Sequence, residues 1–160
     1  MKRIVLLTTV ALMIAAPITV VAQDRHRPAL FGQISLNSGF HPDPHVVRVD
    51  AGGPLNAANI NSRCVGMISD APDFQLTYTA GLHSGGGSLP LLFRTRADAD
   101  TTLVVNAADG RWYCDDDSGG GVNAQVHFFT PQSGVYDIWV GTYDHGDNFV
   151  QAELLITELK

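Results

Sequence analysis

The sequence is poor in cysteine, glutamate and positive charge, and each shortage excludes something. Its two cysteines, Cys64 and Cys114, lack C-x-x-C spacing, so neither a zinc site nor a dithiol redox centre is indicated. Of 16 acidic residues only two are glutamate, and the formal net charge is −6. Nucleic acids and anionic membranes attract proteins through positive charge, so neither is expected as a partner.

Long apolar runs are absent after Ala22, and the segment 1–22 has the composition of a secretory signal peptide. A basic start at Lys2 and Arg3 precedes the apolar stretch 4–16, and small residues lead to cleavage after Ala22. An uncleaved membrane anchor is the alternative, which Pro17 disfavours. We expect the mature chain, 23–160, in the periplasm or outside the cell, not inserted in the membrane. With eight basic residues against 16 acidic ones, its net charge is −8.

In an exported chain the two cysteines are expected to pair. A Cys64–Cys114 disulfide closes a loop of about 50 residues and is worth about 4 kcal/mol in the chain-entropy model. The alternative is two buried free thiols.

Helical periodicity is almost absent, and 14 of the acidic residues are aspartate, which favours turns over helices. Short alternating or β-branched runs are bounded by glycine, proline and aspartate, as strands are. One domain is therefore predicted, residues 23–160, an all-β, jelly-roll-like antiparallel β-sandwich of about eight or nine strands. The expected strands are 30–36, 45–50, 74–79, 89–96, 101–106, 111–114, 124–130, 135–143 and 149–159, with 55–63 as a loop or single helical turn.

The turn at Asp109-Gly110 predicts a hairpin whose central residues take positive φ. That hairpin brings Asp100 and the run 115–117 to the same open end. Clustered carboxylates on loops suit calcium, which takes six to eight oxygen ligands, although the spacing is not that of an EF-hand. The alternative is a solvated acidic turn. The candidate calcium ligands are Asp98, Asp100, Asp115, Asp116, Asp117 and Asn123.

The string Asp117-Ser118-Gly119-Gly120 is similar to the sequence around the nucleophile of trypsin-like serine proteases. A mature chain that spans only 23–160 is too short for the two barrels of such an enzyme. The preceding histidines, His41, His45 and His83, lie in turns rich in proline or glycine. Neighbouring carboxylates also oppose the negative charge that an oxyanion develops. We therefore expect no catalysis, and keep a serine hydrolase using Ser118 as the alternative.

Several motifs in the C-terminal part of the chain resemble the bacterial pre-peptidase C-terminal domain. They are Asp100-Thr-Thr-Leu103, the acidic turn 115–117, Pro131-Gln-Ser-Gly134-Val-Tyr136 with Val140, and the final strand 152–156. The resemblance covers residues 98–158 and implies a jelly-roll sandwich found beside secreted hydrolases. The turn at 40–44, the stop at 51–53 and the cysteine pair are instead similar to small exported proteobacterial proteins often labelled serine peptidases.

The sequence thus favours a non-catalytic exported module that binds a protein or a cell-envelope glycan, with calcium as a possible cofactor. A structural envelope protein that self-associates through an edge strand is a further alternative. Five strand aromatics are candidates for a sugar-stacking platform, although such residues more often belong to the core. They are Trp112, Tyr113, Tyr136, Trp139 and Tyr143.

Overall fold

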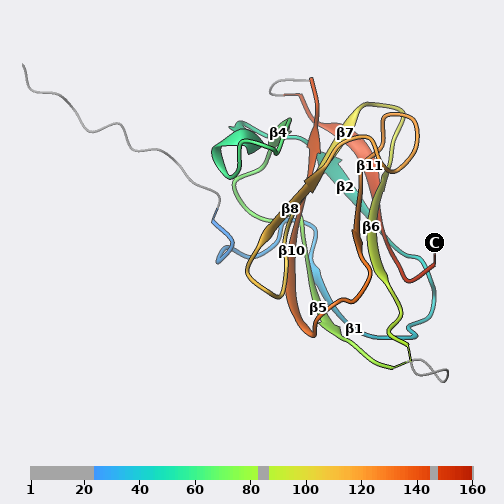
Figure 1. The fold of residues 1–160 in the computed structure, drawn as a ribbon. Helices are drawn as coiled ribbons and strands as arrows, with labels where there is room; N and C mark the ends of the chain where they lie inside the picture. The colour runs from blue at the N-terminus through green and yellow to red at the C-terminus, as the bar shows by residue number, and fades with distance from the viewer. Residues whose placement is uncertain (1–23, 83–86, 145–147, 160) are drawn as a thin grey trace, which may run out of the picture.

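The computed structural model describes residues 24–82, 87–144 and 148–159, which fold into two packed β-sheets (Figure 1). The all-β sandwich expected from the sequence is confirmed. The expected signal peptide, residues 1–22, lies outside the described residues. Within the described ranges, no helix has the length and apolar character needed to cross a membrane.

The first sheet has seven strands and carries the candidate site. They are β1 (Gln33–Asn37), β3 (Leu55–Asn56), β4 (Met67–Ile68), β5 (Phe74–Thr79), β7 (Thr101–Asn106), β8 (Trp112–Asp115) and β10 (Gly134–Thr142). The long strand β10 lies at the centre, with β7 along one side and β5 followed by β4 along the other. Because β8 pairs with β7 alone, it forms one edge of the sheet.

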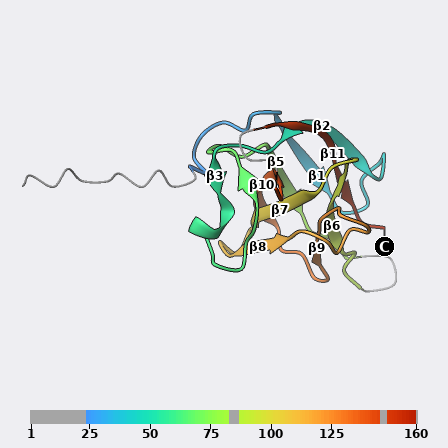
Figure 2. The same ribbon diagram turned by 90° about the horizontal axis from the view of Figure 1, so that it is seen from above.

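The second sheet is antiparallel throughout, and its strands follow the order β2-β11-β6-β9. These are β2 (His45–Ala51), β6 (Leu91–Arg96), β9 (Gln125–Phe128) and β11 (Val150–Thr157). Seen from above, β2 and β11 lie on the opposite side of the core from β7 and β8 (Figure 2). The site on β8 is therefore far from the β2 edge of the second sheet.

Two details differ from the expectation. The described residues form eleven strands rather than eight or nine, because β3 and β4 are two-residue strands that no alternating run predicts. In addition, β1 pairs parallel with β5. Instead of turning back in a hairpin, the chain leaves β1 for the second sheet, so β1 and β5 are not sequential neighbours. The strand also begins at Gln33 rather than Leu30, since Gly32 adopts a φ of 101° just before it.

Alternation along β10 places its side chains in two different apolar clusters. Tyr136, Ile138 and Val140 point between the sheets into the main core, as the period-two pattern predicts. Trp139 points to the outer face of the first sheet, yet its side chain is fully buried. The outer face is therefore covered at this position.

The cover over Trp139 is the segment 55–68, which includes β3, a 3-10 turn (η1, Ala57–Asn59) and β4. Ala57, Cys64 and Ile68 from this segment pack against Trp139 and form a second cluster on the outer face. Figure 1 shows the segment standing beside β10 and β8. Of the two alternatives for 55–63, a loop or a single helical turn, the structure has a 3-10 turn at Ala57–Asn59.

The expected disulfide joins this cover to the edge strand. Cys64 and Cys114 are bonded, their Cα atoms are 5.3 Å apart, and the loop they close spans 50 residues. The disulfide therefore fixes the covering segment against β8.

The predicted hairpin between β7 and β8 is confirmed, and its register places Leu103 opposite Asp115. Its turn differs from the expected one. The backbone N–H of Gly110 donates to the carbonyl of Ala107 at 2.8 Å, and Gly110 alone in this turn has a positive φ, 75°. Asp109 has a negative φ, so the prediction of positive φ at both central residues is wrong.

Candidate functional site

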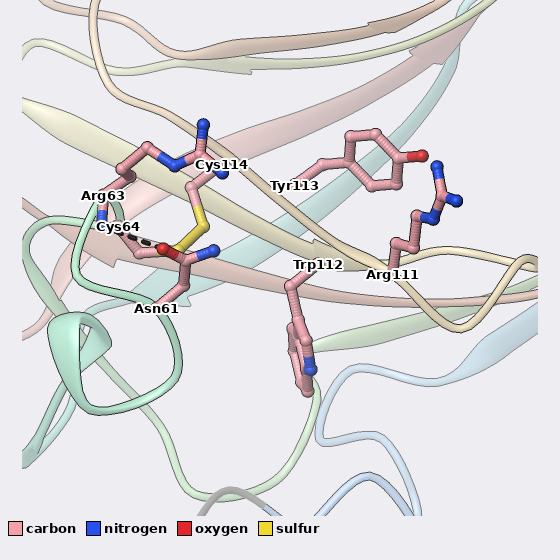
Figure 3. A pocket seen from close by; sticks show the side chains of 7 residues that line it. All are labelled: Asn61, Arg63, Cys64, Arg111, Trp112, Tyr113 and Cys114. Atoms are coloured by element: carbon pink, nitrogen blue, oxygen red, sulfur yellow. Dashed lines mark hydrogen bonds between the residues drawn. A yellow bond between two sulfur atoms is a disulfide. The ribbon is translucent and has the colours of Figure 1, made fainter.

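A cleft of about 390 Å³ runs along the edge strand β8 (Figure 3). One wall is β8 with its preceding residue, and the other is the covering segment near the disulfide. A volume of this size suits a small ligand or a short stretch of a linear one. The lining residues are Asn61, Arg63, Cys64, Arg111, Trp112, Tyr113 and Cys114.

The register of β8 determines which groups face the cleft. The backbone N–H of Ala107 donates to the carbonyl of Arg111 at 2.9 Å and closes the hairpin. Hydrogen-bonded pairs alternate along an antiparallel ladder, so Tyr113 directs its main-chain groups toward β7. Trp112 and Cys114 direct their main-chain N–H and C=O away from β7, toward the open edge. Edge groups of this kind are available to a ligand.

The side chain of Trp112 packs against the side chain of Trp139. The two indole rings are 5.3 Å apart between centroids and inclined by 45°. Trp139 is fully buried, whereas Trp112 is half-buried. A partly exposed indole fixed by a buried one offers a preorganised apolar surface to a flat ligand.

Tyr113, the next residue, faces the other way. It packs into the main core, where its ring lies 4.8 Å from that of Phe128, and its hydroxyl donates to Asp109 Oδ2 at 2.8 Å. This hydrogen bond to the carboxylate raises the pKa of the Tyr113 phenol. Tyr113 therefore lines the cleft near the hairpin while most of its side chain packs against the main core.

Two arginines lie on the cleft. Arg63 follows a local turn in which the side chain of Asn61 accepts a hydrogen bond from the Arg63 backbone N–H at 3.0 Å. The Arg63 side chain has no hydrogen bond or ion pair within the described ranges. Arg111 Nε lies 3.9 Å from Asp109 Oδ2, and the Arg111 guanidinium also interacts with the Tyr113 phenol, opposing the rise in its pKa. Figure 3 shows Arg63 beside the disulfide and Arg111 beyond Tyr113.

A row of polar side chains crosses the outer face next to Trp112. Register places Gln75 beside Asp137, Asp137 beside Asn106 and Asn106 beside Trp112. Gln75 Nε2 donates to Asp137 Oδ1 at 2.7 Å, and Arg25 donates to Asn106 Oδ1 at 3.2 Å. Burial raises the pKa of Asp137, and the Gln75 hydrogen bond opposes that rise. These residues line a second hollow of about 330 Å³.

The acidic turn is organised by Asp115. Its Oδ2 accepts hydrogen bonds from the backbone N–H groups of Ser118 and Gln125, at 2.9 and 2.7 Å. Its Oδ1 accepts the Ser118 hydroxyl at 2.6 Å. The carboxylate thus closes the turn after β8 and anchors it to the start of β9.

Ser118 lies in an exposed part of this turn, and its hydroxyl donates to the Asp115 carboxylate. A serine nucleophile instead needs a base that takes its proton, usually a histidine oriented by a third group. No hydrogen bond between Ser118 and a histidine occurs among the described residues. His83, one of the three histidines considered from the sequence, lies outside the described residues.

The six candidate calcium ligands do not gather at one point. Asn123 uses its side chain on the backbone of Ala97, accepting its N–H at 2.9 Å and donating to its carbonyl at 3.3 Å. Asp98 lines a separate hollow with Arg48 and Arg96. The carbonyl of Asp100 accepts a hydrogen bond from the backbone N–H of Tyr143 at 3.1 Å.

Asp116 and Asp117 remain beside Asp115 on the turn. Partial burial raises the pKa of Asp116, and the neighbouring carboxylates of Asp117 and Asp115 add to the rise. Within the described ranges, no three His, Cys, Asp or Glu side chains are placed to hold one metal ion. Calcium binding at this turn stays a prediction.

Sequence reasoning identified Trp112 and Tyr113 as candidate ligand-binding aromatics but missed Arg63 and Arg111. A signal for the arginines was present: Arg63 directly precedes one cysteine, and Arg111 lies three residues before the other. A disulfide between those cysteines therefore brings both arginines to one place.

No family model, curated protein or solved structure matches the chain. The resemblance to the pre-peptidase C-terminal domain therefore stays a prediction.

Proposed function

We propose that this protein is an exported, non-catalytic binding module that holds a cell-envelope glycan in the β8 cleft. The observation that carries the proposal is Trp112, a half-exposed indole that packs against the buried Trp139 in a cleft also lined by Arg63 and Arg111. Sugar rings have an apolar face that packs on aromatic rings and hydroxyl groups that bond to polar side chains. The cleft supplies both kinds of partner.

The polar row beside Trp112 supports a ligand that extends beyond one ring. Gln75 is partly exposed, whereas Asp137 and Asn106 are buried beside it and already hydrogen-bonded to Gln75, Arg25 and Gly110, so a ligand hydroxyl meets mainly Gln75 and the edge of the row. The residues of the row occupy the same face of the sheet as Trp112. A linear glycan stacked on the indole is thus able to continue across the outer face.

The hydrogen bond of the Ser118 hydroxyl supports binding rather than catalysis. The hydroxyl is engaged with Asp115, on a turn separate from the residues that line the cleft. An oxyanion at this turn would face three carboxylates, which oppose it electrostatically. We therefore assign Asp117-Ser118-Gly119-Gly120 a structural role in the turn after β8.

Export is supported by the disulfide, which is typical of proteins that mature in oxidising compartments. The signal peptide expected at residues 1–22 supports the same placement. In the periplasm or outside the cell, envelope polysaccharides are the abundant polymers that such a cleft meets.

The test is retention of the purified protein on isolated envelope polysaccharides and sacculi. We expect the wild-type protein to be retained and Trp112→Ala to bind at least about tenfold more weakly, because the stacking surface is lost. Trp112→Phe, which keeps an aromatic face, is expected to retain most of the binding. Near-ultraviolet circular dichroism establishes that each variant is folded.

Phe129→Ala is the matched control, since Phe129 is 69% exposed and does not line the cleft. Its binding is expected to equal that of the wild type. Equal retention of the Trp112→Ala and wild-type proteins, or no retention of either, contradicts the proposed function.

A further inference from the structure

We propose that the glycan held in the β8 cleft is acidic, a polysaccharide of the polyuronate class whose carboxylates pair with Arg63 and Arg111. This inference rests on the proposed function, because it names the ligand class for the same site. It follows from the charge of the cleft, which differs from the charge of the molecule around it.

The chain has 16 acidic and ten basic residues, yet no acidic residue lines the cleft and two arginines do. The described part of the chain contains seven arginines in total. The lining of the cleft is therefore positively charged on an otherwise acidic protein. This local charge favours an anionic ligand in the cleft.

The arginines outside the cleft are engaged with the protein itself. Arg27 pairs with Asp70, Arg48 and Arg96 pair with Glu153, and Arg25 and Arg94 donate to side-chain amides. Within the same described ranges the Arg63 side chain has no such partner, whereas Arg111 lies 3.9 Å from Asp109, the same distance as Arg48 from Glu153, and also interacts with Tyr113. The cleft therefore holds Arg63, whose side chain has no partner among the described residues, and Arg111, which is weakly paired and 80% exposed.

The positions of the two arginines favour a repeating anion over a single one. Arg63 stands at the end of the cleft next to Cys114, and Arg111 stands at the other end (Figure 3). Residues 111 and 114 are about 10 Å apart along a strand that rises about 3.3 Å per residue. Figure 3 shows both guanidiniums on the side of β8 opposite the Trp112 ring, so a chain with an acidic group on successive units reaches both by crossing the strand beside the indole.

Polyphosphates fit the surface less well than polyuronates. Nucleic acids carry a dense line of phosphates and bind proteins that neutralise many of them. This cleft offers two cations on a molecule with a formal net charge of −6. A polymer with lower charge density and a ring to stack suits it better.

An acidic peptide fits less well because the edge is obstructed. A peptide that adds to a sheet pairs with a run of outward main-chain groups on the edge strand. On β8 those groups belong to Trp112 and Cys114, and the disulfide attaches the covering segment at Cys114. Trp112 alone remains for such pairing, which is too little for strand addition.

The experiment is titration calorimetry of the purified protein with oligomers of polygalacturonate, alginate and hyaluronate. Each is compared with its carboxyl-reduced, neutral counterpart of the same length. We expect at least one acidic oligomer to bind about tenfold more tightly than its neutral counterpart. Its affinity is expected to fall as salt rises from about 50 to 500 mM, because screening weakens the arginine contacts.

Arg63→Gln and Arg111→Gln are each expected to weaken binding of the acidic oligomer about fivefold or more and leave the neutral oligomer unaffected. Arg48→Gln is the matched control: it removes the same charge from the β2 edge, where the Arg48 side chain is 86% exposed. Its affinity for both oligomers is expected to equal that of the wild type.

Equal affinity for acidic and neutral oligomers, with both lost in Trp112→Ala, overturns the acidic ligand and leaves the glycan-binding function in place. Failure of every oligomer, together with failure of sacculi and envelope polysaccharides, overturns both. Binding of polyglutamate as tight as that of the acidic oligomers, and unaffected by Trp112→Ala, assigns the cleft to an acidic peptide instead.

Discussion

The carboxylate of Asp73 replaces the main-chain partner that Val140 loses where β5 and β10 separate. The ladder between these strands ends at Phe74 and Ile138. One step further, Asp73 Oδ2 accepts the backbone N–H of Val140 at 2.6 Å, and Ser69 donates its hydroxyl to Asp73 Oδ1 at 3.1 Å. Asp73 is fully buried, so its ionisation is tied to folding.

Stability is expected to fall as pH rises from about 4 to 7. Burial raises the pKa of Asp73 from 3.8 to about 7, and the hydrogen bonds from Val140 and Ser69 only partly offset this. The native state then binds more protons than the unfolded state between those two values, and folding is favoured at the lower pH. A tenfold difference in proton affinity between the two states corresponds to about 1.4 kcal/mol. Urea denaturation at pH 5 and pH 8 measures the effect.

Asp73→Asn isolates this contribution. The amide oxygen keeps an acceptor for Val140, and the amide nitrogen donates to the Ser69 hydroxyl, which reverses that hydrogen bond. Because the amide does not ionise, the slope of stability against pH from 4 to 7 is expected to flatten. Asp73→Ala leaves the buried Val140 N–H without its side-chain acceptor and is expected to cost about 1 to 3 kcal/mol at pH 5. An unchanged slope in Asp73→Asn contradicts the assignment of this pH dependence to Asp73.

Much of the fold was predictable because local patterns and tertiary packing agree. The strands at 74–79 and 101–106 have the bounds that alternation and flanking turn residues indicate. Alternation along the strand at 135–143 also puts Trp139 on the face opposite Tyr136, Ile138 and Val140, where the structure has it. Its complete burial was not predictable, since the cover comes from a segment with no strong helix or strand pattern.

The residues of the cleft were harder to predict from the sequence than the fold was. Arg63 and Arg111 belong to separate segments, and only the disulfide and the β7–β8 register bring them to one cleft. The clustered aspartates gave a stronger sequence signal than the arginines. Adjacent carboxylates need not form one ligand set, however, because Asp115 accepts hydrogen bonds from Ser118 and Gln125, Asn123 bonds to Ala97, and Asp98 lines a separate hollow.

Loss of the disulfide is expected to lower the free energy of unfolding by about 4 kcal/mol, because Cys64 and Cys114 close a loop of 50 residues. Urea denaturation of a Cys64→Ser, Cys114→Ser double variant measures the loss. A reducing agent is expected to destabilise the wild type by the same amount and leave the double variant unchanged. Equal stability of the oxidised wild type and the double variant contradicts this prediction.

Ser118 is expected to be unreactive. A fluorophosphonate probe should leave the wild-type protein unlabelled, because the Ser118 hydroxyl donates to Asp115 rather than to a base that activates it. Ser118→Ala is expected to change stability by no more than about 0.5 kcal/mol, since the residue is exposed. Labelling that disappears in Ser118→Ala would establish a nucleophile and contradict the non-catalytic proposal.

Asp115, in contrast, is expected to matter for stability. Asp115→Ala removes the acceptor for Ser118 and for the backbone N–H of Gln125, and about 1 to 3 kcal/mol is expected to be lost. Asp115→Asn keeps one oxygen acceptor and is expected to lose less. Thermal melting of the three proteins gives the order, and a stability of Asp115→Ala equal to that of the wild type contradicts the role of Asp115 in closing the turn.

The acidic turn itself is tested with Asp116→Asn plus Asp117→Asn. In EDTA this double variant is expected to melt slightly above the wild type, by an amount corresponding to at most about 0.5 kcal/mol. The reason is that burial and the charges of Asp117 and Asp115 raise the pKa of Asp116, so its ionised form is disfavoured in the folded state. If calcium binds here, millimolar calcium raises the melting temperature of the wild type and not that of the variant, reversing their order. Equal melting temperatures of the wild type in EDTA and in calcium contradict the calcium prediction and leave 115–117 as a solvated turn.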